Sequence, residues 1–148
     1  MNEVSDVGHI IQLAVAPVFL LAGIGALLNV VTHRLARVID RARVLEARLG
    51  EQPSATEIGR IKDELAALDK RMLYAQRAIW LFSIAALLIC VVVATLFIGE
   101  FIAANVETLV AMLFVATMLG MVAGLVLFLM EISIATRTLR VRETLFAK

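Results

Sequence analysis

Residues 28–58, with the sequence LNVVTHRLARVIDRARVLEARLGEQPSATEI, decide the fold of this 148-residue chain. Apolar side chains recur at alternating steps of three and four residues, which places them on one stripe of a helix. This stripe consists of Leu28, Val31, Leu35, Val38, Ala42, Leu45 and Leu49. A 3–4 repeat is typical of the seam of a coiled coil. The sequence therefore predicts a helix with an apolar face that ends near residue 50.

A turn is predicted at residues 50–54, which read GEQPS. Gly50 favours the left-handed conformation that closes a helix, and Pro53 prevents the helix from continuing. Ser54, followed three residues later by Glu57, fits a capping box at the start of a second helix. The 3–4 spacing then resumes at Ile58, Ile61, Leu65, Leu68, Met72, Ala75 and Ile79.

Folding the chain at this turn brings the two stripes face to face, because a short connection makes consecutive helices antiparallel neighbours. The predicted facing pairs are Leu45 with Ile61, Ala42 with Leu65, Val38 with Leu68, and Leu35 with Met72. Both stripes also run on into apolar stretches. Each helix of the hairpin is therefore predicted to form one continuous rod with the apolar stretch beside it.

Three stretches carry no charged residue: residues 10–31, 78–99 and 108–130. Each has the roughly 20 residues that a helix needs to cross the hydrocarbon core of a membrane. The whole chain is 61% hydrophobic, whereas soluble domains are about half apolar. Backbone groups in lipid must be satisfied within their own segment, so each stretch is predicted to be helical. The predicted fold class is all-α: one membrane domain, residues 1–148, with three transmembrane helices and an antiparallel coiled-coil hairpin at residues 32–77.

The basic residues predict the orientation. All fourteen Lys and Arg residues lie in two segments, ten in residues 32–77 and four in residues 131–148. Residues 1–9 and 100–107 carry only acidic charges. Because Lys and Arg concentrate on the cytosolic side, the hairpin and the helical tail at 131–148 are expected in the cytosol. The N-terminus and the loop at residues 100–107 are expected outside.

Polar residues near the ends of the spans are candidate functional residues, because such groups are costly in a membrane. Glu131 follows the third span at the depth of Arg34 and Arg77. The preferred interpretation is an ion pair that ties the third span to the base of the hairpin, and the alternative is a cation or proton site. Asn29 and Thr32 are expected either to form an interhelical hydrogen bond or to line a pathway.

Small residues mark candidate packing faces. Ala116, Gly120 and Gly124 follow one another at four-residue steps on the third span. Such a face packs either against another helix of the same chain or against a second subunit.

No catalytic set, cofactor motif or metal site is predicted. His9 and His33 are expected on opposite sides of the membrane, and Cys90 is the single cysteine. No phosphate-binding loop or nucleophile elbow is present. Carboxylates alternate with the basic residues of the hairpin, which argues against nucleic acid because phosphate binding favours a field of one sign. Anionic lipid head groups are the alternative partners of the basic residues nearest the membrane, which are Arg34, Arg37, Arg71 and Arg77.

Three stretches resemble a known family: APVFLLAGIG at residues 16–25, THRLARVIDRAR at 32–43 and EISIA at 131–135. The chain is similar to a bacterial family of small multi-pass membrane proteins of unknown function. The family pattern has a proline near the start of the first span, an N-R-L-x-R-x-x-D-R-x-R stretch at its cytosolic end, and an E-I-x-x-S/A element near the end of the last span. His33 stands where the pattern has Asn, so a role of that amide does not transfer. The resemblance implies a bacterial inner-membrane location and no established activity.

Together these features favour a non-catalytic membrane scaffold or assembly module. It is expected to be a homo-oligomer whose cytosolic hairpin contacts itself or a cytosolic partner. The alternative is an oligomeric ion channel or small-solute transporter with Asn29, Thr32 and Glu131 near its path.

Overall fold

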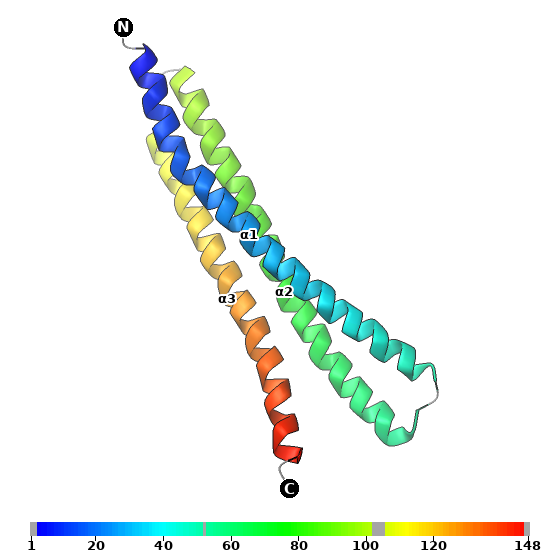
Figure 1. The fold of residues 1–148 in the computed structure, drawn as a ribbon. Coiled ribbons are helices and arrows are strands. Elements are labelled where there is room, and N and C mark those ends of the chain that lie inside the picture. Colours follow the sequence, from blue (N-terminus) through cyan, green and yellow to red (C-terminus); the bar gives the residue numbers. More distant parts are fainter. Residues whose placement is uncertain (1–2, 52, 102–105, 147–148) are drawn as a thin grey trace. The chain divides into compact units, whose positions relative to one another are not determined.

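In the residues that it describes, the computed structural model has three helices, α1 (Glu3–Leu49), α2 (Ala55–Phe101) and α3 (Glu107–Phe146) (Figure 1). It describes residues 3–51, 53–101 and 106–146, and describes side chains for residue 8 and for residues 11–51, 53–99 and 106–136. Residues 102–105 of the expected outer loop lie outside this part, as do the side chains of the basic tail residues Arg137, Arg140 and Arg142. The all-α prediction is confirmed for the described residues.

Helices α1 and α2 each run without interruption for 47 residues. Each contains one apolar stretch and one helix of the hairpin, so the predicted continuity is confirmed. Pro17 lies inside α1 and is buried. Helix α3 extends the third apolar stretch into the basic tail and is 40 residues long. By length and composition, all three helices can cross a membrane.

Burial recurs every seven residues on each helix. The repeating buried positions are Pro17, Ile24, Val31, Val38 and Leu45 on α1; Ile61, Leu68, Ala75, Phe82 and Ile89 on α2; and Thr117, Gly124 and Glu131 on α3. A seven-residue period keeps one face of a helix turned toward its neighbours when helices wrap around one another. The heptad spacing is therefore the sequence pattern that selects the buried face of all three helices.

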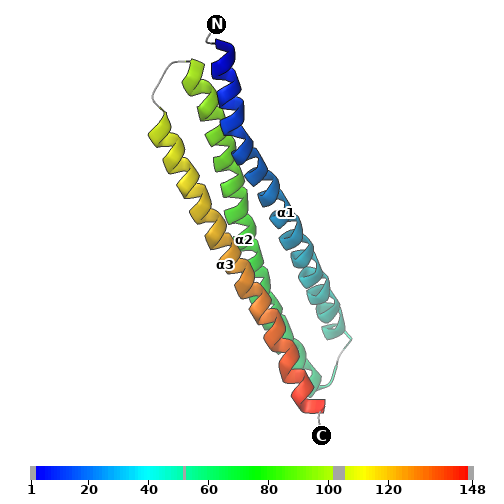
Figure 2. The same cartoon turned by 60° about the vertical axis from the view of Figure 1, so that its left-hand side comes forward.

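Contacts divide the chain, which the sequence analysis treats as one domain, into two compact units. Unit 1 contains Met1–Asn29 and Trp80–Ala123, and unit 2 contains Val30–Ile79 and Gly124–Lys148. In unit 1, the segments of α1, α2 and α3 lie side by side in both views (Figures 1 and 2). Gly120 of α3 faces α2 there, since a Cβ atom at Gly120 would lie 3.8 Å from the Cβ of Ala85. Gly99 of α2 lies so close to Val106 that a Cβ atom at Gly99 would overlap the valine side chain.

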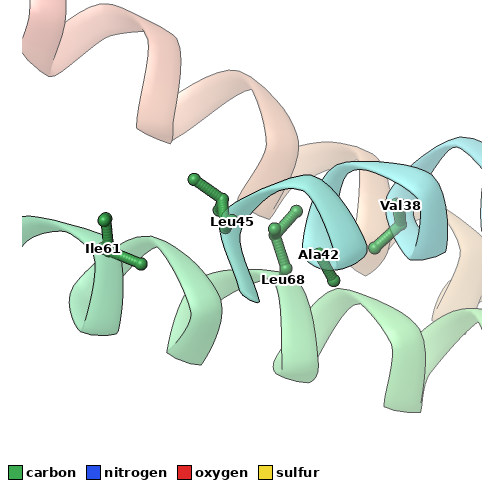
Figure 3. Packing of buried hydrophobic residues seen from close by; sticks show 5 residues of the cluster. All are labelled: Val38, Ala42, Leu45, Ile61 and Leu68. Atoms are coloured by element: carbon green, nitrogen blue, oxygen red, sulfur yellow. The ribbon is translucent and has the colours of Figure 1, made fainter. Parts of the chain in front are cut away.

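The two helices of the hairpin in unit 2 are joined by an apolar seam. The seam consists of the buried residues Val38, Ala42, Leu45, Ile61 and Leu68 (Figure 3), with Leu49, Leu65 and Met72 packed against it. All fourteen residues of the two predicted stripes are buried or half-buried. An exposed ion pair between Arg41 and Glu64, with Nη2 2.7 Å from Oε1, also links the two helices.

The turn lies where the sequence places it, but two predicted details are wrong. Gly50 does not take the left-handed conformation. Instead, α1 ends in a tighter turn, with Gly50 N donating to Ala47 O at 3.1 Å and Glu51 N donating to Arg48 O at 3.2 Å. The capping box is also not formed. The carbonyl of Ser54 accepts the first helical hydrogen bonds of α2, while its hydroxyl lies 3.2 Å from the Thr56 hydroxyl.

Candidate functional site

Unit 2 contains a buried carboxylate held between two guanidinium groups. Glu131 of α3 is 1% exposed. Its Oε2 accepts a hydrogen bond from Nε of Arg34 on α1 at 3.0 Å, and Nη2 of Arg34 lies 2.9 Å away. Its Oε1 accepts hydrogen bonds from Nε and Nη2 of Arg71 on α2, at 3.0 and 2.8 Å. We call Arg34, Arg71 and Glu131 the Arg–Glu–Arg cluster.

The heptad pattern positions each member of this cluster. Arg34 follows the buried Val31 by three residues and precedes Val38 by four, so it lies on the edge of the buried face of α1. Arg71 has the same relation to Leu68 and Ala75 on α2. Glu131 is itself on the buried repeat of α3. Three helices from distant parts of the sequence therefore bring charged side chains to one point.

The cluster supplies opposite charge and hydrogen bonds to the Glu131 carboxylate, a group that is costly to bury. An ionised carboxylate removed from water must be paired and hydrogen-bonded. Glu131 meets both conditions, since both of its oxygens accept charge-assisted hydrogen bonds, which are the stronger kind. The side chains of Arg34 and Arg71 keep 35% and 21% of their surface exposed. The carboxylate is thus sealed, whereas both cations remain open to solvent or lipid.

The expected ion pair with Arg77 is not formed. Arg77 was expected to pair with Glu131 because the two lie at a similar depth along their helices, but Arg71 takes that position in the structure. Arg77 follows Ala75 by two residues, about 200° around the helix, and is exposed. The sequence alone could have identified Arg71 as the partner of Glu131, because Arg71 lies between Leu68 and Ala75 of the predicted stripe.

Phe128 contributes a further contact to the cluster. The Cζ atom of Arg34 lies 5.7 Å from the centre of the Phe128 ring, one turn before Glu131 on α3. A guanidinium group over an aromatic face is attracted by the electron-rich ring. Arg34 is therefore held to α3 by both Glu131 and Phe128. Sequence analysis missed Phe128 because an aromatic residue in an apolar stretch gives no distinctive signal.

The remaining candidates differ in exposure. Asn29 and Thr32 are exposed on α1, Gly120 faces α2 of the same chain, and Gly124 is buried. The position of Gly120 beside Ala85 of α2 is consistent with intrachain packing, one of its two predicted roles.

Thr117 is a buried polar residue that sequence analysis missed. Its side chain is 0% exposed, and its Oγ1 donates to Leu113 O at 2.9 Å within α3. The seven-residue spacing of Thr117, Gly124 and Glu131 is the sequence signal that could have identified it.

In the cluster, opposite charges hold α1, α2 and α3 together in unit 2, an arrangement we call an electrostatic clamp. Within the described residues, no three His, Cys, Asp or Glu side chains come together as a metal site would require. Cys90 is exposed on α2 as a free thiol. The cluster combines two cations with one anion, so it carries one excess positive charge.

These observations define a class of protein, all-helical in its described part, with three helices long and apolar enough to cross a membrane. A family model described as a protein of unknown function (DUF2721) matches residues 14–141. The chain belongs to this family, which is uncharacterised, as the resemblance noted from the sequence implied. No curated protein and no solved structure matches the chain.

Proposed function

We propose that this protein is a non-catalytic scaffold of the bacterial inner membrane, inserted through three spans. The main support is the surface of its apolar stretches. Phe19, Leu119 and Trp80 are 73%, 66% and 64% exposed, and many other large apolar side chains of the three helices are exposed as well. Soluble monomers rarely present contiguous apolar surface on this scale. Such a surface is stable when lipid tails cover it.

The orientation rests on the basic residues. All Lys and Arg residues lie between the first two spans or after the third, so the positive-inside rule favours a cytosolic hairpin and tail. The hairpin is then an antiparallel coiled coil held at its base by the Arg–Glu–Arg cluster. It presents a solvated, charged face to a cytosolic partner or to another copy of the chain.

Self-association is part of the same proposal. In the most apolar part of α3, 11% of the residues are buried, compared with 22% in α1 and in α2. Helix α3 therefore has more surface available than its neighbours for lipid or for a second subunit. An oligomeric channel or transporter is the alternative function. It gains less support, because Glu131 is sealed against two guanidinium groups. The positive charge of these two groups would repel a further cation that approached Glu131.

Insertion and orientation can be tested with single cysteines. Cys90 is the only cysteine, so Cys90→Ser provides a background for Ser54→Cys in the turn and Glu107→Cys at the start of α3. In intact cells a membrane-impermeant maleimide is expected to label position 107 and to reach position 54 only after permeabilisation. The opposite pattern would overturn the orientation, and release of the protein from membranes by carbonate washing would overturn insertion.

The scaffold and channel functions differ in two measurements. Native mass spectrometry from lipid nanodiscs is expected to give a defined oligomer, and a strict monomer would overturn self-association. Ion flux into proteoliposomes is expected to be absent across a range of voltage and pH. Flux that Asn29→Leu reduces and Arg48→Gln, at the far end of the hairpin, leaves unchanged would favour the channel.

A further inference from the structure

The Arg–Glu–Arg cluster has more cationic donors than its carboxylate can use. Each guanidinium group carries five N–H donors. Glu131 is engaged by the Nε and Nη2 atoms of Arg34 and Arg71. Among the described residues, the contacts of both arginines with Glu131 leave their Nη1 amino groups for other acceptors. The pair also carries one positive charge beyond the charge of Glu131, so the chemistry of a suitable acceptor is anionic.

The position of the cluster along the helices is that of a lipid head group. Arg34 lies three residues beyond the end of the first apolar stretch at Val31, or about 4.5 Å at the rise of an α-helix. Glu131 directly follows the third stretch. The head-group layer on each side of the hydrocarbon core is about 5–7 Å thick. The guanidinium group of Arg71 lies at the level of Glu131, because its Nη2 is 2.8 Å from Oε1.

Both arginines are accessible at this depth while being fixed in place. Their side chains are 35% and 21% exposed, whereas the carboxylate between them is 1% exposed. Glu131 and Phe128 hold Arg34, and Glu131 holds Arg71. Guanidinium groups fixed by such contacts lose little further conformational freedom on binding an oxyanion, and their planar shape suits a phosphate.

We infer that Arg34 and Arg71 form a binding site for the phosphate group of an anionic phospholipid. This inference rests on the proposed insertion into the membrane. Glu131 positions the two guanidinium groups and offsets half of their charge, and the lipid phosphate neutralises the remainder. The site thereby couples the packing of α1, α2 and α3 in unit 2 to the charge of the surrounding leaflet.

The test is lipid retention by the full-length protein. Purified protein in detergent is titrated with phosphatidylglycerol or phosphatidylcholine and examined by native mass spectrometry. Preferential binding of phosphatidylglycerol is expected. Arg34→Gln and Arg71→Gln are each expected to weaken it about fivefold, the size typical of one basic residue at an anionic surface. Arg77→Gln is the matched control, since it removes the same charge from an exposed membrane-proximal position outside the cluster.

Glu131→Gln separates positioning from net charge. It removes the carboxylate that fixes both guanidinium groups, so phosphatidylglycerol binding is expected to weaken although the positive charge of the cluster rises, with an unchanged far-UV circular dichroism spectrum and elution volume. Unchanged or tighter binding in this variant would mean that positive charge alone attracts the lipid, and it would overturn the inference. So would equal losses in Arg77→Gln and the cluster variants, which would indicate diffuse attraction. Displacement of the lipid by an equal concentration of inorganic phosphate would identify a soluble anion as the ligand and would also overturn it. Because binding is measured in detergent, failure leaves membrane insertion to the cysteine-labelling test.

Discussion

Glu131→Gln is the substitution that most directly tests the Arg–Glu–Arg cluster as a clamp. It preserves the shape of the side chain and removes its charge. It also replaces one acceptor oxygen with an amide that donates hydrogen bonds, as do the facing guanidinium groups. Two partly buried cations then face each other without a counter-charge. The folded state is expected to lose stability while its helices remain intact.

The magnitude follows from burial and contact geometry. Removing one partner of a fully buried ion pair costs about 3–5 kcal/mol, whereas exposed pairs contribute about 0.2–1 kcal/mol. Glu131 is 1% exposed and accepts three hydrogen bonds, but Arg34 and Arg71 are 35% and 21% exposed, so solvent screens part of the interaction. An intermediate loss of about 2–3 kcal/mol is expected. The loss for Arg71→Gln should exceed that for Arg34→Gln, because Arg71 is less exposed and donates two hydrogen bonds.

The assay is SDS-induced unfolding in mixed micelles, followed by circular dichroism of the full-length protein. Arg77→Gln is the matched control, and a change within about 0.5 kcal/mol is expected for this exposed residue. A double-mutant cycle between positions 71 and 131 should give a coupling energy above that of positions 34 and 131. If Glu131→Gln and Arg77→Gln unfold at the same SDS fraction, the cluster does not stabilise the fold and the reasoning is refuted.

Three further predictions concern packing and an exposed ion pair, and the same unfolding assay checks each one. Leu45→Ala in the seam should lower the free energy of unfolding by about 2–4 kcal/mol, whereas Val44→Ala at the exposed neighbouring position should change it by less than about 0.5 kcal/mol. Equal effects would contradict the burial of Leu45 in the seam. Gly99→Ala should be destabilising because its methyl group overlaps a valine side chain, while Gly120→Ala should be neutral or stabilising by up to about 1 kcal/mol. Arg41→Gln removes an exposed ion pair and should cost less than about 1 kcal/mol, and a larger loss would mean that this pair is shielded from solvent.

Sequence reasoning correctly predicted the helical hairpin because its signals are local. The 3–4 spacing of Val38, Ala42 and Leu45 identifies the buried face of one helix without reference to any distant residue. Pro53 interrupts the helical pattern in the same local way. Where local signals compete, the details went wrong: Gly50 closes α1 with i→i−3 hydrogen bonds, and the Ser54 hydroxyl turns to Thr56.

The identity of the candidate site could be predicted only in part. The position of Glu131 after a charge-free stretch marked it as a residue that needs a cation. Several arginines lie near Glu131 when positions along the helices are compared. This comparison alone favoured Arg34 and Arg77 as its partners. The angular position of each arginine around its helix decides between them, and it favours Arg71 by its spacing from Leu68 and Ala75.

By itself, the sequence determined three apolar stretches, two continuous helical rods, the place of the turn and the segregation of all basic residues. Each depends on spacing along one helix or on composition, which the order of residues records directly. The tertiary structure alone decided that Arg34, Arg71 and Glu131 meet, with Phe128 beside them. Their separations of 97 and 60 residues are closed by the packing of three helices. Relative rotation and axial register set which side chains touch, and no single helix encodes either quantity.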